Sequence, residues 1–321
     1  LHKEYRRQRQ MCIRDRFTTA RLTMAFFRVV SVTTISTTCH THFPKDNMEI
    51  QFIHSANLVE VVYGDRFDQP FDESEDWFEL TKVTREAISW DMAGVQTLSA
   101  EPELVTMTQR GSRRYSSSAQ IELVTPEQLS VATLADVLSR RRSCENFSDQ
   151  PVDFRTLSEI CSLSYGVTAR FGEQQFRTAP SAGALFPIDV FIHALNVEGL
   201  DRGVYYYSPG DNALSPLPAL ADDQQLIRAL MMEDKVAPAF VVTLVATFWR
   251  TRFKYGHRGM RFALIEAGHI AQNVVLAATA KNLGSRPIGG FIDDELNGVI
   301  PGINGTDDAA VYSILVGHEG E

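Results

Sequence analysis

The chain has 321 residues, of which 44% are apolar and 22% are charged, the balance of a folded globular protein. Its net charge of −9 argues against a nucleic-acid-binding protein, and no apolar run reaches the roughly 18 residues of a membrane-spanning helix. The motifs C-x-x-C, G-x-G-x-x-G and G-x-x-x-x-G-K-[ST] are absent, which excludes zinc ribbons, thioredoxin-like sites and the two commonest nucleotide loops.

Charge divides the chain at about residue 47. Residues 1–47 carry a net charge of +6, and the remainder carries −15. Residues 11–16 (MCIRDR) resemble a translated sequencing-library adapter, so we predict that residues 1–47 are an artefactual or untranslated head without ordered structure. A secretory signal peptide is the alternative. Because only Cys144 and Cys161 lie outside this head, we expect a cytoplasmic protein.

Residues 48–125 are predicted to form a small acidic N-terminal region that ends in a linker. Within it, residues 71–80 (FDESEDWFEL) indicate a helix or an acidic loop. Residues 109–119 (QRGSRRYSSSA) are typical of a solvated linker. Residues 126–321 then form the main predicted domain.

Two capped helices are predicted at the start of that domain. Thr133 and Asp153 each precede an apolar repeat at helical spacing, so each can cap a helix. The second helix is predicted to stop near Gly166. The apolar face of the first helix comprises Leu134, Val137 and Leu138.

Strands and one long helix follow. The predicted strands are residues 188–195, 204–208, 239–247 and 310–317. The long helix is predicted over residues 258–283, buried on several faces, with Gly284 as its C′ residue. Because helices and strands interleave without a β-α-β rhythm, the pattern favours an α+β fold.

Five short motifs contain residues suited to chemistry. The run Arg140 to Arg142 with Ser143 is either a solvated helix end or a phosphate site, because guanidinium groups and hydroxyls donate to phosphate oxygens. Residues 177–187 (RTAPSAGALFP) are either a structural turn or a rigid small-residue loop that a flat ring can approach closely.

The next motif places Lys254 beside Tyr255, just before the long helix. A phenol beside an ammonium group can transfer protons, although a surface lysine next to a half-buried tyrosine is the simpler interpretation. In that helix, Glu266 and His269 form one half of a di-iron signature. Since no second copy exists, we expect a packing or supporting role. Gly289 and Gly290 allow close backbone approach to a ligand.

In order and spacing, these motifs resemble the SagB-type dehydrogenases of the nitroreductase superfamily. The resemblance rests on R-R-S, R-T-A-P-S-A-G-A-L-F-P, G-V-Y-Y-Y, K-Y-G-x-R, E-A-G-H-x-A-Q-N and G-G-F-x-D-D, and it covers residues 126–317. It implies an antiparallel sheet flanked by helices, with FMN bound at a homodimer interface. It also implies oxidation of azoline rings to azoles in a ribosomally made peptide, beside a cyclodehydratase complex, with oxygen reoxidising the flavin.

The resemblance also assigns roles to individual residues. Lys254 and Tyr255 match the catalytic pair. The positions implied to bind FMN are Arg141, Arg142, Ser143, Pro180, Ser181, Ala182, Gly183, Gly289 and Gly290. Two alternatives stay open, namely an NAD(P)H-dependent nitro- or quinone reductase on the same fold and a non-catalytic subunit of a cyclodehydratase complex. No metal, nucleic acid or membrane is implied.

Overall fold

The structure is a computed structural model that describes residues 73–83, 93–101, 103–104, 112–113, 115, 119–124, 132–172, 174–218, 223–233, 235 and 237–320. The predicted head, residues 1–47, lies outside these ranges.

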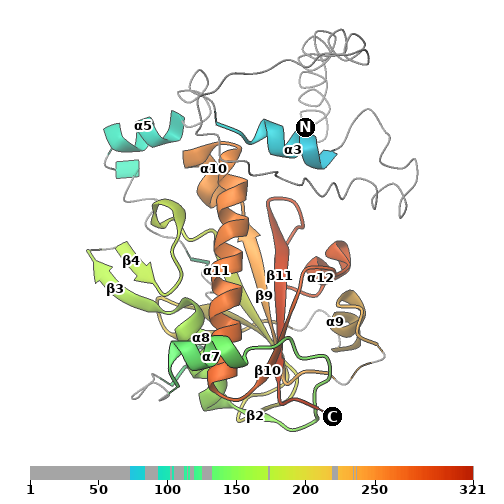
Figure 1. The fold of residues 1–321 in the computed structure, drawn as a ribbon. Coiled ribbons are helices and arrows are strands. Elements are labelled where there is room, and N and C mark those ends of the chain that lie inside the picture. Colours follow the sequence, from blue (N-terminus) through green and yellow to red (C-terminus); the bar gives the residue numbers. More distant parts are fainter. Residues whose placement is uncertain are drawn as a thin grey trace, which may run out of the picture. The chain divides into compact units, whose positions relative to one another are not determined.

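A seven-stranded sheet forms the centre of the described structure, and all its strand pairs are antiparallel (Figure 1). In spatial order the strands are β1 (Ile121–Glu122), β8 (Ala213–Pro216), β7 (Gly203–Ser208), β5 (Ile188–Ala194), β9 (Phe240–Thr247), β11 (Asp308–Gly317) and β10 (Gly284–Ile288). The four strands predicted from apolar runs are β5, β7, β9 and β11, and they are neighbours in the middle of the sheet. Their apolar runs suit positions that are buried on both faces.

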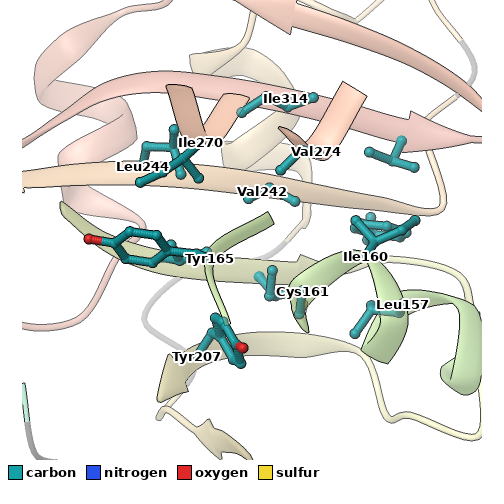
Figure 2. Packing of buried hydrophobic residues seen from close by; sticks show 14 of the residues in the cluster. Leu157, Ile160, Cys161, Tyr165, Tyr207, Val242, Leu244, Ile270, Val274 and Ile314 are labelled. Carbon is teal, nitrogen blue, oxygen red and sulfur yellow. The ribbon is translucent and has the colours of Figure 1, made fainter. Parts of the chain in front are cut away.

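Helices cover both faces of this sheet. On one face lie α11 (Arg258–Ala280) and α8 (Phe154–Tyr165), whose apolar side chains form the cluster in Figure 2. On the other face lie α9 (Asp223–Ala229) and α12 (Asp293–Gly298). Strand β9 serves both layers, because Val242 and Leu244 belong to the first cluster and Val241 and Val245 to the second. The predicted α+β architecture with an antiparallel sheet is therefore confirmed.

Two smaller pairings complete the strands. Strands β2 (Val152–Asp153) and β6 (Val197–Glu198) pair in parallel. Strands β3 (Val167–Phe171) and β4 (Gln174–Arg177) form an antiparallel hairpin directly before the small-residue loop. The hairpin leads the chain from α8 to that loop.

Both predicted N-caps are confirmed. Thr133 accepts a hydrogen bond from the Asp136 N–H (3.2 Å) at the start of α7 (Leu134–Arg140). Asp153 accepts from the Thr156 N–H (2.9 Å) at the start of α8, which ends at Gly166 as predicted. The apolar face predicted for α7 is buried only at Val137. The other two residues of that face are exposed in the single chain, Leu134 by 65% and Leu138 by 52%.

The long helix ends earlier than predicted, and Gly284 is not its C′ residue. Helix α11 ends at Ala280, and Asn282 adopts the left-handed conformation (φ 56°) that the C′ position requires. The Asn282 N–H donates to the Thr279 carbonyl and the Leu283 N–H to the Ala278 carbonyl, which together form a Schellman motif. Gly284 instead begins β10, where a side chain would collide with Cys144.

The segment predicted to be a solvated linker contributes to the core at two described positions. Arg113 pairs with Asp189 (2.7 Å) and with Asp308, and Tyr115 packs on Tyr206 with ring centroids 5.0 Å apart. Burial alone would raise the pKa of Asp189, but the Arg250 and Arg113 guanidinium groups hold it below its usual range. The prediction of a solvated linker is therefore wrong for Arg113 and Tyr115, because long-range ion pairs leave no local signal in the sequence.

Three further helices lie at the N-terminal end of α11. Helix α10 (Trp249–Tyr255) directly precedes it, while α3 (Glu73–Leu80) and α5 (Ala93–Ala100) come from the N-terminal region. Residues 71–80 thus contain a helix rather than only an acidic loop. Arg261 of α11 donates a hydrogen bond to the hydroxyl of Thr81 (2.7 Å), the residue that directly follows α3.

Candidate active site

A tight turn shapes the small-residue loop between β4 and β5. The Ala184 N–H donates to the Ser181 carbonyl (3.1 Å), and the Phe186 N–H donates to the Ser181 hydroxyl oxygen (2.9 Å). Gly183, Ala184 and Phe186 all have left-handed backbone conformations, with φ of 63°, 51° and 47°. For the two residues that are not glycine this costs about 1–2 kcal/mol each, and such strain is concentrated at functional sites.

The Lys254–Tyr255 pair meets this loop. Both side chains come from the last turn of α10 and are half-buried. A Cβ atom at Gly183 would lie 2.5 Å from the Tyr255 hydroxyl and 2.8 Å from Lys254 Nζ. The loop and the pair are about 70 residues apart in the sequence, and the fold joins them at a glycine where a Cβ atom would displace the ends of both side chains.

Helix α5 packs directly on the segment that carries the pair. A Cβ atom at Gly94 would collide with the Phe253 carbonyl oxygen and would lie 2.7 Å from the Lys254 Cα. The N-terminal region thus supports α10 through backbone contact. Sequence reasoning missed this support because a single glycine in a short helix carries no signal of its distant partner.

The arginine run lies beside β10. Ser143 forms a parallel bridge with Ser285, and the Cys144 N–H donates to the Ser285 carbonyl (2.9 Å). Arg141 is half-buried, whereas Arg142 is exposed and donates to the carbonyls of Ser139 and of Arg141 itself. The backbone of this run therefore lies at the start of this edge strand.

The glycine pair lies just past the opposite end of β10. From Ser285 to Gly290 an extended strand covers about 17 Å. Gly289 and Gly290 are exposed and have no positive φ, and a Cβ atom would fit at either without collision. Neither backbone strain nor internal crowding requires glycine at these positions, and the bare backbone they expose is accessible to a ligand.

A cavity of about 310 Å³ opens beside this glycine pair. Two cationic side chains, Lys235 and Arg286, line it together with Gly289, Gly290 and apolar residues. Neither cation is recognisable as a site residue from the sequence, because a lone Lys or Arg has no distinguishing pattern.

Glu266 lies behind the small-residue loop rather than in a metal site. Its Oε1 atom accepts a hydrogen bond from the Tyr165 hydroxyl (2.7 Å), while His269 is exposed. Arg177 stacks over Tyr165 and Phe186, 4.5 Å and 4.3 Å from the ring centroids. Burial raises the pKa of Glu266 to about 7.

The chain is similar to several known proteins. It is 36% identical to Putative nitroreductase MJ1384 of Methanocaldococcus jannaschii over 168 residues, which cover 52% of this chain and 83% of that protein. It is 40% identical to the microcin B17-processing protein McbC of Escherichia coli over 124 residues, 36% of this chain and 45% of McbC. The matched region is thus less than half of McbC.

The fold also resembles solved structures. The Escherichia coli microcin synthetase McbBCD complex with truncated pro-MccB17 bound matches with a TM-score of 0.50 and 24% identity. That match covers 75% of this chain and 99% of the matched one and supports the fold alone. The profile of the Nitroreductase family matches residues 138–318, more than half of the chain, and the chain belongs to this family.

Proposed function

We propose that this protein is an FMN-dependent oxidoreductase of the SagB type, which oxidises azoline rings in a ribosomally made peptide to thiazoles or oxazoles. The observation that carries the proposal is the convergence of Lys254 and Tyr255 on Gly183 of the loop. The similarity to McbC, a peptide-processing protein, supports the same substrate class. We further propose that residues 126–321 form the catalytic domain of a cytoplasmic homodimer that works with a cyclodehydratase complex.

The residues present fit FMN. The donors of Arg141, Arg142 and Ser143 at one end of β10 suit a phosphate. The loop from Pro180 through Ser181 and Ala182 to Gly183 offers small side chains, and Gly289 with Gly290 offers bare backbone, which together suit a flat ring. When bound, FMN would supply the redox chemistry by accepting a hydride at N5.

The protein's own contribution is orientation and proton transfer. Tyr255 takes the α-proton of the azoline ring at its phenolic oxygen. Lys254 stabilises the negative charge that develops on the ring nitrogen, because an ammonium group positioned for the transition state needs no reorganisation. The loop and the glycine pair would hold the flat ring, and a substrate bound against it beside Lys254 and Tyr255 would react as in an intramolecular reaction.

An anaerobic reduction experiment tests this function. An azoline-containing peptide should bleach the visible absorption of the FMN-loaded protein in a single turnover, and the matching azole peptide should not. NAD(P)H should reduce the flavin much more slowly. Rapid reduction by NAD(P)H without reduction by the azoline peptide would instead favour a nitro- or quinone reductase, the alternative that the Methanocaldococcus relative supports. Bound FMN that neither donor reduces would favour a non-catalytic subunit.

Replacing Arg141 tests the phosphate assignment. Arg141→Ala removes a charge-assisted contact and should weaken FMN binding by about 1.5–3 kcal/mol, roughly tenfold to a hundredfold. The matched control is Arg140→Ala, because Arg140 already pairs with Asp136 (2.9 Å) and should leave the affinity unchanged. Fluorescence titration of the apoprotein with FMN gives both dissociation constants. Full FMN occupancy in Arg141→Ala at limiting FMN would overturn the assignment.

A further inference from the structure

Glu266 is a buried carboxylate with one oxygen left over. Its side chain projects from α11 behind the loop and is 2% exposed. The Tyr165 hydroxyl donates to Oε1. Oε2 is buried and makes no hydrogen bond of good geometry with a described residue, although the nearby Ser181 hydroxyl interacts with the carboxylate and favours its charged form. The core packing explains the orientation of Tyr165, because its ring lies in the apolar cluster while its hydroxyl points away from it (Figure 2). A buried polar atom without a partner needs an explanation.

The groups around this carboxylate come from four elements. Tyr165 of α8 and Ser181 of the loop present hydroxyls, and Arg177 of β4 and Arg250 of α10 present positive charge. The effect of burial, which disfavours the charged form, is larger than the opposing effect of each of these groups, so the pKa of Glu266 rises to about 7. At neutral pH the carboxylate can therefore gain or lose a proton at little cost, and Oε2 is the free position for that proton.

We propose that Glu266, which lies on α11 behind the loop, is a positioning residue. It takes up a proton at Oε2 when the ring held by the loop is reduced. The inference rests on the proposed function. The physical reason is that a hydride adds two electrons and one proton to the ring and leaves it with one more negative charge. A like charge behind the same loop then favours the neutral form of Glu266.

The step balances over the whole reaction. The azoline loses a hydride and a proton and becomes an azole. The bound ring would accept the hydride, and Tyr255 would take the α-proton and release it to solvent. Glu266 would take up one proton from solvent, so that charge and protons balance. Molecular oxygen, the oxidant of the proposed function, then removes two electrons and both protons as hydrogen peroxide. Glu266 returns to its charged form in the same step.

The reduction potential of bound FMN measures this proton. Each proton taken up with two electrons changes the equilibrium constant tenfold per pH unit, which is about 30 mV. Between about pH 7.5 and about pH 8.5 the wild-type potential should fall by about 60 mV, because the hydride and Glu266 each account for one proton. Glu266→Gln should fall by only about 30 mV. An anaerobic titration against redox dyes gives these values.

Two further variants make the result specific. Glu159→Gln removes a different buried carboxylate, which lies on α8 and pairs with Lys281 and Arg155. This variant should keep the wild-type dependence of the potential on pH. Tyr165→Phe keeps Glu266 but removes the hydroxyl that favours its charge, so the steep region should move to higher pH. This variant also decides the matter if Glu266→Gln does not fold.

Thermal unfolding of the apoproteins measures the protonation of Glu266 in the absence of the cofactor. An acid with a raised pKa in the folded state binds more protons there than when unfolded, so wild-type stability should fall as the pH rises from about 4.5 to about 7. In Glu266→Gln this part of the fall should be absent.

A wild-type potential that changes by only about 30 mV per pH unit, or an equally steep slope in Glu266→Gln, would overturn the proposal. A wild-type protein that binds no FMN would instead refute the proposed function.

Discussion

Lys254→Ala and Tyr255→Phe should each oxidise an azoline peptide at least about a hundredfold more slowly than the wild type, because acid–base groups typically contribute a factor of about 10²–10⁴. Both variants should still purify as yellow, FMN-loaded protein. The residues proposed to bind the cofactor lie just past β10, on the segment beside it and on the loop, whereas the pair comes from α10. Loss of the pair therefore removes chemistry and leaves cofactor binding intact.

Single-turnover reduction of the flavin by the peptide is the measurement, because it separates this step from reoxidation by oxygen. The double variant should be little slower than the slower single variant, since groups that act as one unit are not additive. Tyr205→Phe is the control, because Tyr205 lies on β7, outside the loop. Its hydroxyl donates to the Asp201 carbonyl (2.7 Å), so its loss should not change the rate. Wild-type rates in both single variants would mean that another group accepts the proton.

The parts of the fold that the sequence predicts are those with local causes. The caps at Thr133 and Asp153 depend on side chains three residues from the N–H groups that they bind. Strands β5 and β9 are rich in β-branched and aromatic apolar residues, so most of their burial follows from composition. These features need no knowledge of the rest of the chain.

Local sequence patterns do not predict the edge strands and the helix ends of this fold. Strand β10 contains a glycine and a proline, which argue against a strand in the interior of a sheet but are tolerated at its edge. The sequence therefore predicts a helix end at Gly284, whereas Asn282 in fact forms it. The hairpin of β3 and β4 is mostly exposed and lacks an apolar repeat.

The candidate site shows the same division. The motifs were visible in the sequence, but only the fold shows that Gly183 meets Tyr255 and that Gly94 supports Lys254. Arg113 reaches Asp189 across 76 positions. Contacts of this range depend on the completed sheet and leave no periodic signal in the sequence.

Gly183→Ala should reduce the rate of azoline oxidation per bound flavin by about a hundredfold, with only a modest loss of stability. The new Cβ atom would meet the ends of two flexible side chains, the Tyr255 hydroxyl at 2.5 Å and Lys254 Nζ at 2.8 Å. Those ends can swing aside, so the fold survives, but the proposed acid–base groups are displaced by about 1 Å. A misplacement of that size at a reacting centre can cost about a hundredfold in rate.

Gly172→Ala is the matched control for this variant. Gly172 has a similar left-handed backbone (φ 57° against 63°), but a Cβ atom there meets nothing within 4 Å. Both variants therefore have the same backbone cost of about 1–2 kcal/mol, which a chemical denaturation experiment measures. Only Gly183→Ala should lose activity per flavin, because only there does the added methyl group touch Lys254 and Tyr255. Equal rates in the two variants, each normalised to its flavin content, would show that the contact between the loop and the pair does not set the reaction geometry.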